Sequence, residues 1–594
     1  MTAPFEQIYN QALAHHRHGR LAEADRLYAQ AVKLKPDLVE AHNNRGAIRQ
    51  LAGDWAGALA CYDAAIRFRP DYAEGLANRG NVLIQLRRYD QALASFDRAL
   101  ALTPGRASAL NGRAGILSKL KRFEQALATY GQLRAADPAN PYALGGMLIA
   151  AMNLCDWKTV EHLTLQVKHG IADGTAVIAP FLFLGLSDDN ALQRKCARNA
   201  IAELRLHAVP PLWRGERYGH GRIRLGYISS DFCQHPVPLL IARLIEDHDR
   251  SRFEVLGFST GLNDNSPIRA RIEKAFDQFH DLQGQPPARI AQFLRAREVD
   301  ILVDLTGHTE GDHFAILAAR PCPIQVNYLG YPGTCGTDSL DYILADPVVA
   351  PFDHQQFFSE KIAQLSDCYF PTSYGALLPP PSRAEAGLPE EGFVFASFNN
   401  SWKITRPIFE VWTRLLQAVP GSVLWLLDSS TGFRDSLGRE AAARGVAPDR
   451  LVFAPRLSPQ ANLARQPLAD LMLDTSPYNG HMTTSDALWA CVPLVTLAGS
   501  AFAGRVAMSQ LLALGMGELV SESVAAYETL ALKLARDPEL LRATRDKLTH
   551  NRNAMPLFDI PRLVQNVECA FATMMEIQTK GEAPRRFRVG DRAV

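Results

Sequence analysis

The chain has 594 residues, a length that predicts several domains. Apolar residues make up 47% and charged residues 21% of the sequence, and the formal net charge of +1 gives no reason to expect binding to nucleic acid or to an acidic membrane. No run of residues has membrane-spanning length, the N-terminus has no apolar core of the signal-peptide type, and the nine cysteines form no Cys-x-x-Cys pair. We therefore expect a cytoplasmic protein without a metal site or a disulfide framework.

The first 140 residues repeat with a period of 34. Prolines recur at positions 36, 70, 104 and 138, alanines at 24, 58, 92 and 126, and aromatic residues at 28, 62, 96 and 130. This pattern is typical of the tetratricopeptide repeat, in which two antiparallel helices meet at small alanines and proline ends the second helix. We expect repeats at 5–38, 39–72, 73–106 and 107–140, and a degenerate unit from residue 141. Stacked repeats form a superhelix with a concave groove.

Asparagine occupies the sixth position of three repeats, at Asn10, Asn44 and Asn78. That position lies on the helix that lines the groove, where an amide can bind the backbone of an extended peptide without reading its sequence. The pattern therefore predicts a peptide or protein partner in the groove. The alternative is that these amides bond only within the superhelix. Arginines fill another register, which we interpret as part of a solvated helix face: Arg45, Arg79 and Arg113.

The period is lost after residue 141, and a Pro- and Gly-rich stretch at 209–221 marks a boundary. Short β-branched runs then alternate with helical stretches, which predicts parallel sheets with helices on both faces. A Pro-rich linker at 379–382 separates two such sets, so we expect two doubly wound lobes whose strand ends face a common cleft. The expected strands are 222–230, 253–259, 301–305 and 324–328 in the first lobe and 393–398, 423–427, 451–454, 468–473 and 494–497 in the second.

The expected domains follow from these changes in pattern. They are a tetratricopeptide superhelix at 1–155, a helical connector at 156–220, a first α/β lobe at 221–385, a second at 386–580, and a basic tail at 581–594 for which we expect no ordered structure.

A loop rich in polar groups lies between Asp474 and Asp486, after an expected strand and before a helical stretch at 487–492. It contains an Asn-Gly pair, several hydroxyls and His481. Backbone N–H groups and the positive end of a helix dipole at such a place favour an anion, phosphate above all. The alternative is an ordinary turn that leads into a capped helix.

Lys403 stands just beyond another expected strand end, where it can neutralise a phosphate as a point charge. The alternative is a solvated surface lysine. Lys403, the helix opening at Thr483–Asp486 and the Gly-rich turns together suit a diphosphate leaving group. Asp486 can bind a ribose or cap the helix. Neither a Walker motif nor a Gly-x-Gly-x-x-Gly fingerprint after a strand is present.

Four motifs at the strand ends complete the pattern: Ser229-Ser-Asp-Phe-x-x-His-Pro, Leu329-Gly-Tyr-Pro-Gly-Thr, Phe398-Asn-Asn-x-x-Lys-Ile and Asn479-Gly-His-x-Thr. With the repeats, they resemble the O-linked N-acetylglucosamine transferases, including the bacterial and SPINDLY-like members. The resemblance covers nearly the whole chain. It implies an inverting, metal-independent glycosyltransferase of the two-lobed GT-B fold that uses UDP-N-acetylglucosamine, without a further cofactor, to modify Ser and Thr of proteins.

The resemblance also implies roles for single residues. Lys403 matches the family lysine on the diphosphate, and Asn400 takes the place of a neighbouring glutamine. His235 matches a histidine beside the sugar and the acceptor, a candidate general base with a pKa range suited to that role. The alternative for His235 is a core or purely positioning residue. The remaining implied donor-binding residues are His481, Thr483 and Asp486 in the loop, and Gly333 and Thr334 in the Gly-rich turn.

Three positions depart from the family pattern: Met482 replaces a threonine, and Asn462 and Pro459 stand where the animal enzymes have a histidine and a lysine. SPINDLY-type relatives use GDP-fucose, so the donor is a choice between two nucleotide sugars. Two further alternatives are a nucleotide-binding repeat scaffold without turnover and a glycosyltransferase acting on small molecules. A homodimer is one option for the quaternary structure.

Overall fold

The computed structural model describes residues 3–206 and 210–590. The chain divides into two compact units, Met1–Ala151 and Met152–Val594, and the boundary falls within helix α9 (Pro141–Leu154). Within the described ranges, no helix combines the length and the apolar character needed to cross a membrane.

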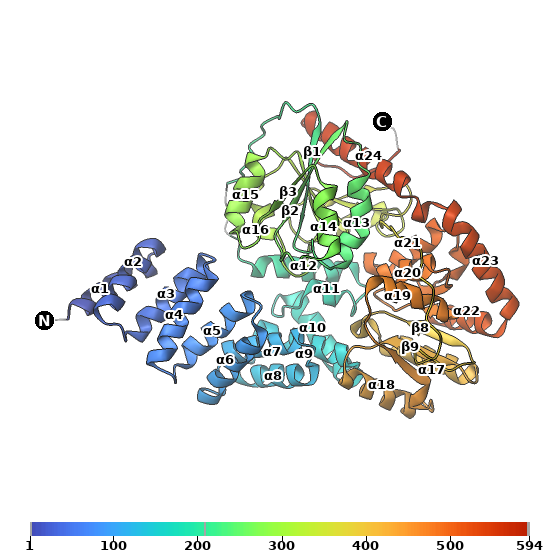
Figure 1. Cartoon of the computed structure of the whole chain (residues 1–594), viewed down its shortest axis with the longest axis horizontal. Coiled ribbons are helices and arrows are strands. Elements are labelled where there is room, and N and C mark those ends of the chain that lie inside the picture. Colours follow the sequence, from blue (N-terminus) through green and yellow to red (C-terminus); the bar gives the residue numbers. More distant parts are fainter. Residues whose placement is uncertain (1–2, 207–209, 591–594) are drawn as a thin grey trace. The chain divides into compact units, whose positions relative to one another are not determined.

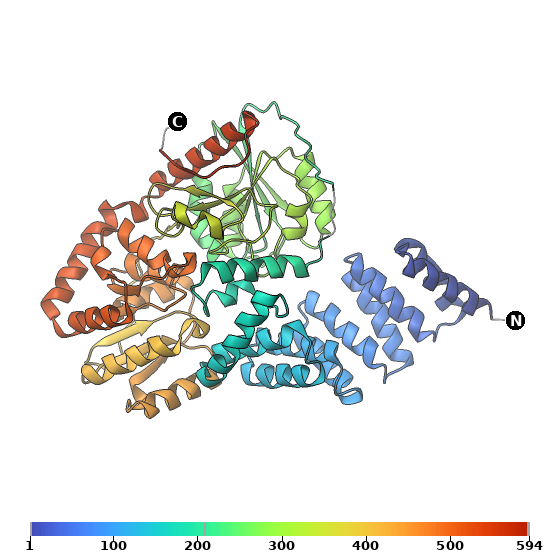
Figure 2. The ribbon, with the colours of Figure 1, turned by 180° about the vertical axis from the view of Figure 1, so that it is seen from behind.

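The first unit is a row of antiparallel helix pairs, drawn in blue in Figures 1 and 2. The alanines of the repeat are fully buried where the helices of a pair meet, and the aromatic rings of Tyr28, Tyr62 and Phe96 are buried beside them. Glycine leaves room for these rings, because a Cβ on Gly80 would lie 2.6 Å from the ring of Phe96. The tetratricopeptide prediction is confirmed. The helices are α1 (Pro4–Arg17), α2 (Leu21–Leu34), α3 (Val39–Leu51), α4 (Trp55–Phe68), α5 (Ala73–Gln85), α6 (Tyr89–Leu102), α7 (Ala107–Lys119) and α8 (Phe123–Ala136).

The repeated arginines do more than face solvent, so our interpretation of them was incomplete. Arg79 on α5 donates to Asp63 on α4 at 2.6 Å and to the hydroxyl of Ser95 on α6 at 2.7 Å. Arg113 repeats both bonds one unit later, with Asp97 and Thr129. Each arginine thus joins the preceding repeat to its own, which links neighbouring units as well as helices of one pair.

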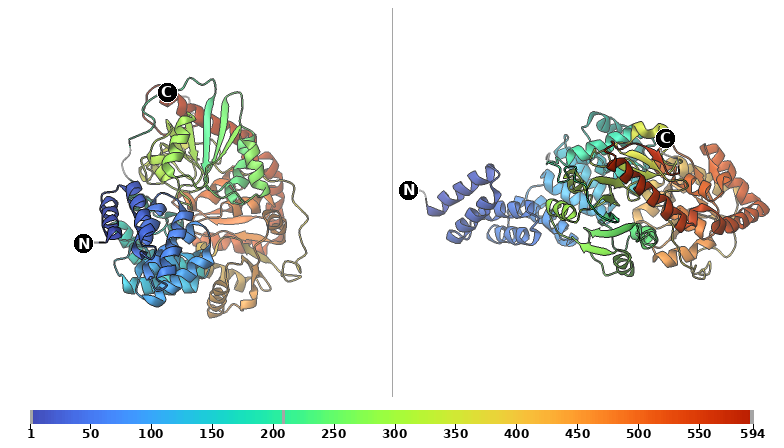
Figure 3. Two further views of the ribbon diagram at one scale, coloured as in Figure 1. Left: turned by 60° about the vertical axis from the view of Figure 1, so that its left-hand side comes forward. Right: turned by 90° about the horizontal axis from the view of Figure 1, so that it is seen from above.

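The second unit begins with a helical connector and continues into the first lobe, whose strands lie side by side in the left view of Figure 3. Its sheet is parallel, with the strand order β14-β7-β6-β5-β4-β1-β2-β3. The strands after β1 are added on one side of it up to β3 and on its other side from β4 on, so the switch point of the sheet lies between β1 and β4. The connector helices are α10 (Trp157–Asp173), α11 (Pro180–Phe183) and α12 (Asn190–Glu203). The strands are β1 (Ile223–Ser229), β2 (Phe253–Ser259), β3 (Gln278–Asp281), β4 (Ile301–Asp304), β5 (Ile324–Asn327), β6 (Tyr342–Ala345), β7 (Lys361–Gln364) and β14 (Phe587–Arg588). The covering helices are α13 (Pro236–Glu246), α14 (Pro267–Ala275), α15 (Pro287–Ala296) and α16 (Phe314–Ala318).

The expectation of a structureless tail was wrong for residues 581–590, and residues 591–594 lie outside the described ranges. Phe587 and Arg588 pair in parallel with β7, and the N–H of Val589 donates to the carbonyl of Gln364 at 2.8 Å. The ring of Phe587 is 9% exposed and lies edge-on to Tyr342, 5.9 Å between centroids. The tail therefore covers a sheet edge whose backbone groups would otherwise need another partner.

The second lobe holds the other parallel sheet, in the order β10-β9-β8-β11-β12-β13, with its switch point between β8 and β11. Both lobes are therefore doubly wound, as predicted. The strands are β8 (Val394–Ser397), β9 (Val423–Leu427), β10 (Leu451–Ala454), β11 (Leu471–Leu473), β12 (Leu494–Leu497) and β13 (Val520–Ser521). The helices are α17 (Arg406–Ala418), α18 (Thr431–Ala443), α19 (Pro459–Arg465), α20 (Met482–Trp489), α21 (Val506–Ala513), α22 (Val524–Arg536) and α23 (Pro538–Ala554).

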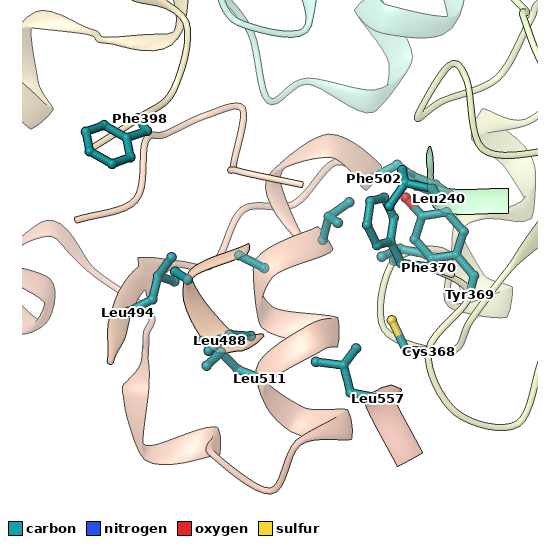
Figure 4. Packing of buried hydrophobic residues seen from close by; sticks show 14 of the residues in the cluster. Leu240, Cys368, Tyr369, Phe370, Phe398, Leu488, Leu494, Phe502, Leu511 and Leu557 are labelled. Carbon is teal, nitrogen blue, oxygen red and sulfur yellow. The ribbon is translucent and has the colours of Figure 1, made fainter. Parts of the chain in front are cut away.

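Several contacts join the lobes, among them one made by the last helix and one made by a pair of aromatic rings. The last helix, α24 (Ile560–Thr579), returns to the first lobe, where Glu568 accepts from the ring of His248 at 3.0 Å and from the N–H of Asp249 at 2.7 Å (Figure 1). Figure 4 shows the second contact, in which Tyr369 lies edge-on to Phe502 with 5.1 Å between ring centroids.

Phe587→Ala should destabilise the first lobe by about 3 kcal/mol, because it removes a buried ring and loosens the edge strand. Chemical denaturation and hydrogen exchange across β7 measure the effect. Arg585→Ala, which changes an exposed side chain in the same tail, is the control. Equal stability and equal exchange in the Phe587→Ala protein and the wild type would contradict the assigned edge strand.

Candidate functional site

Two adjoining cavities lie between the lobes, next to the switch points of both sheets. The first measures about 510 Å³ and the second about 630 Å³. Crevices at the switch points of doubly wound sheets are the usual ligand sites of such folds. Six of the predicted residues line the first cavity: His235, Asn400, Lys403, His481, Thr483 and Asp486. The residues shared by both cavities are His235, Pro236, Asn400, Tyr478, His481 and Met482.

The carboxylate of Asp474, at the end of β11, fixes the loop that follows. It is 1% exposed and accepts the N–H of Thr475 at 2.8 Å and the N–H of Gly480 at 2.6 Å. The hydroxyl of Thr496 on β12 donates to its other oxygen at 2.6 Å. A buried carboxylate is tolerated only when hydrogen bonds replace its water shell, and here they draw the loop back onto its own strand.

Lys403 lies on the turn Ser401–Lys403, which follows β8. Its ammonium donates to the carbonyl of Asn479 at 2.8 Å and sits 3.7 Å from the ring centroid of Tyr478. Burial lowers the pKa of Lys403 to about 7, and the nearby charge of Asp474 opposes that shift. The surface-lysine alternative is therefore excluded. An anion in the cavity would favour the charged form of this amine.

Helix α20 begins at Met482, five residues before the helical stretch at 487–492 that the sequence suggested. The first turn of a helix leaves N–H groups without intrahelical partners, so this start suits an anion. His481 precedes the helix, and burial holds its pKa well below the usual value, which makes the ring neutral. Its Nε2 lies 3.3 Å from the carbonyl of Ala503.

Two polar side chains of the helix are held by residues that the sequence analysis missed. The hydroxyl of Thr483 donates to Asn399 at 2.8 Å, and the hydroxyl of Tyr374 donates to Asp486 at 2.8 Å. Burial raises the pKa of Asp486 to about 7. Asn399 is part of the Phe398-Asn-Asn motif, in which the sequence analysis gave this residue no role, whereas Tyr374 lies in the segment between the lobes, where no local pattern marks it.

Asp486 is thus not a helix cap, because its side chain bonds to Tyr374 rather than to the start of its own helix.

Arg456 is a further cation that the sequence analysis did not single out. It lines the first cavity, and its guanidinium donates to the side-chain oxygen of Asn400 at 3.0 Å. Pro459 and Asn462, two of the positions at which the sequence differs from the family pattern, line the same cavity. Arg465 donates to the side-chain oxygen of Asn462 at 2.6 Å, which turns the amide nitrogen of Asn462 away from Arg465.

His235 caps α13 and reaches both cavities. Its Nδ1 accepts the N–H of Val237 at 3.4 Å and lies 3.8 Å from the carboxylate of Asp231. With Nδ1 as acceptor, the neutral ring carries its proton on Nε2, which then donates. A general base at Nε2 needs the other tautomer, with its Nδ1–H directed at Asp231.

Gly333 and Thr334 are not brought to the cavities. The hydroxyl of Thr334 donates to the buried carboxylate of Glu360 at 2.6 Å, and the carbonyl of Gly333 accepts from Asn327. Their turn instead closes tightly on β4, since a Cβ on Gly330 would lie 2.0 Å from the carbonyl oxygen of Leu305. The contacts of Gly333 and Thr334 are internal to the first lobe, and their positions do not support the donor-binding role that the resemblance implied.

The three repeat asparagines differ in their surroundings. Asn44 donates to the hydroxyls of Tyr9 and Tyr28, at 3.4 and 3.2 Å, and Asn78 donates to the side chain of Asn43 at 3.1 Å. Asn10 is exposed. Two of the three amides therefore make bonds within the superhelix, as the alternative predicted, and their contact with a peptide stays a prediction.

Comparison with known proteins agrees with this geometry. The family model for glycosyl transferase family 41 matches residues 196–380 and 375–567. The chain belongs to glycosyl transferase family 41. Tetratricopeptide models match residues 51–86 and 78–141, so the family member carries repeats before its two lobes. The two lobes have the GT-B fold, as the resemblance implied.

Several relatives have curated descriptions. The chain is 37% identical over 379 residues to the probable UDP-N-acetylglucosamine–peptide N-acetylglucosaminyltransferase SEC of Arabidopsis thaliana, covering 62% of this chain and 39% of the relative. It is 27% identical over 474 residues to the UDP-N-acetylglucosamine–peptide N-acetylglucosaminyltransferase of Caenorhabditis elegans, covering 61% and 41%. The chain thus spans about two fifths of the length of these relatives.

A solved structure is similar over a longer stretch. It is a lysine-to-methionine mutant of the O-GlcNAc transferase of Thermobaculum terrenum, with 25% identity and a TM-score of 0.68. The likeness covers 91% of this chain and 98% of that one.

Asp474→Asn should lower the free energy of unfolding of the second lobe by about 3 kcal/mol, because an amide cannot accept every hydrogen bond that the carboxylate accepts. Chemical denaturation measures the loss, and hydrogen exchange should rise across residues 474–486. Asp435→Asn, at an exposed position on α18, is the control. Unchanged exchange in the loop would show that Asp474 does not anchor it.

Proposed function

We propose that this protein transfers N-acetylglucosamine from UDP-N-acetylglucosamine to serine and threonine hydroxyls of proteins. The observation that carries the proposal is the buried ammonium of Lys403 in the cavity whose wall also holds the start of α20. Both features suit a diphosphate, and both stand at the switch point of the second lobe. The names of the relatives supply the sugar and the acceptor class.

In this proposal the donor lies across the first cavity. Lys403 and the N–H groups at the start of α20 hold the diphosphate, and the hydroxyl of Thr483 adds a donor. Asp486 accepts the ribose hydroxyls. Arg456 adds a second positive charge at the cavity wall. The sugar then points toward the second cavity, where the acceptor hydroxyl enters.

The proposed reaction inverts the anomeric carbon. The acceptor oxygen attacks that carbon from the face opposite the diphosphate, the carbon–oxygen bond to the diphosphate breaks, and its electron pair leaves with UDP. Lys403 stabilises the charge that develops on the leaving group, the role that a metal ion fills in other enzymes. We propose that His235 removes the hydroxyl proton through Nε2, in the tautomer whose Nδ1–H faces Asp231.

The repeats supply the acceptor site in this proposal. An extended protein segment in the groove would meet Asn10 directly, and Asn44 and Asn78 through the side-chain oxygens that their present donor bonds leave available. The compartment we propose is the cytoplasm, as the cysteine pattern indicates.

Lys403→Ala should lower kcat/KM for the donor by about 100-fold, since it removes the main positive charge that stabilises the leaving diphosphate. Transfer is measured with a panel of UDP- and GDP-sugars and a mixture of protein acceptors. Lys547→Ala, an exposed lysine paired with Glu518, is the control. If the wild type transfers no sugar from any donor, the proposed function is refuted. Transfer from GDP-fucose alone would show that the transferred sugar is fucose and not N-acetylglucosamine.

The value of kcat/KM for the donor should fall as the pH rises above about 7. Burial lowers the pKa of Lys403 to about 7, so the amine loses its proton and its attraction for the diphosphate as the pH rises through that value. The measurement is kcat/KM for the donor between about pH 5 and 10, a range that covers both the protonated and the neutral form of Lys403. A rate that stays constant up to the ordinary lysine range would contradict a buried, easily deprotonated Lys403.

A further inference from the structure

The turn that carries Lys403 is held from behind by the helical connector. The thiol of Cys155 donates to the carbonyl of Ser401 at 3.6 Å, and the indole N–H of Trp157 donates to the carbonyl of Ile404 at 3.1 Å. These two carbonyls lie on either side of Lys403 in the chain. The connector therefore forms hydrogen bonds at both ends of the lysine turn, although about 250 residues separate the partners in sequence.

A cavity of about 220 Å³ lies on the same side of the turn, between Trp157 and Trp402. Most protein interiors are close-packed, and a void leaves its lining without neighbouring atoms on one side. Trp402 of the turn packs on Phe181 and Tyr478, with ring centroids 5.7 and 5.2 Å away. The two hydrogen bonds from Cys155 and Trp157 fix the backbone of the turn beside the cavity. The cavity lining is Met152, Trp157, Val160, Glu161, Thr164, Gly185, Leu186, Trp402, Ile404, Thr405, Arg406 and Pro407.

The other face of the same segment contacts the donor loop. Lys403 donates to the carbonyl of Asn479 at 2.8 Å, and the hydroxyl of Thr405 donates to the carbonyl of Ser476 at 2.9 Å. A shift of the turn into the cavity would therefore move the ammonium relative to the loop. Small displacements of a group that stabilises a leaving group cost large factors in rate.

We propose that Trp157 is a positioning residue for Lys403, which fixes the lysine turn against the donor loop through its indole N–H. The proposal rests on the function proposed above. Trp157 is 4% exposed and packs on Phe409 of α17, with 5.1 Å between ring centroids, so the direction of its N–H is set by the core. Phenylalanine could keep much of this packing but has no donor. Trp157 thus acts on the diphosphate through Lys403 without touching the donor.

The test compares Trp157→Phe with Trp213→Phe. Trp213 also donates its indole N–H to a backbone carbonyl, that of Glu216 at 2.9 Å, but in an exposed segment before the first lobe. For Trp157→Phe we expect kcat to fall by about tenfold with little change in the donor KM. The alkaline fall of kcat/KM should also move to higher pH, because a loosened, better hydrated Lys403 regains part of its ordinary pKa. Trp213→Phe should match the wild type in kcat, in the donor KM and in the pH at which kcat/KM falls.

Hydrogen exchange across residues 399–405 in the absence of donor gives a readout that needs no activity. Exchange should rise in Trp157→Phe and not in Trp213→Phe. Cys155→Ala, which removes the weaker thiol donor at the other end of the turn, should shift exchange and kcat in the same direction by a smaller factor. Wild-type kinetics, pH profile and exchange in Trp157→Phe would overturn the positioning role. An inactive wild type would refute the proposed function instead, and the exchange result would still decide the role of Trp157.

Discussion

The buried carboxylate of Asp474 is the constraint on which the proposed donor site depends. Burying this charge is costly, and the N–H groups of Thr475 and Gly480 and the hydroxyl of Thr496 offset the cost only when the loop folds back on β11. That fold places the carbonyl of Asn479 where it meets Lys403. The carboxylate of Asp474 at the end of β11 thus fixes the conformation of the loop, and the loop fixes the position of the Lys403 ammonium.

The site needs both lobes and the segments that join them. His235 comes from the first lobe and Lys403 from the second, so their spacing depends on how the lobes are held. Helix α24, the Tyr369–Phe502 contact and the bond from Tyr374 to Asp486 all cross between the lobes or follow the segment that joins them. The helical connector adds a fourth tie through Trp157.

The sequence predicted the parts of the fold that rest on repetition and on strand ends. A 34-residue period marks stacked helix pairs because every unit meets the same neighbours. Parallel pairing brings the polar residues after β8 and β11 to one edge of the second sheet, and those after β1 lie at a strand end of the first sheet. It missed β3, β6, β7, β13 and β14, which are two to four residues long and pair only in the folded lobes. It also assigned Gly333 and Thr334 to the donor, because a Gly-rich turn looks the same whether it approaches a ligand or another strand. The tautomer of His235 depends on Val237 and Asp231, which only the geometry brings into view.

The most direct test of the account is a crystal structure of the wild-type protein with UDP bound. We expect the diphosphate within hydrogen-bonding distance of Lys403 and the first turn of α20, with the ribose hydroxyls on Asp486. UDP bound elsewhere, or a diphosphate that leaves Lys403 on the carbonyl of Asn479 alone, would contradict the account.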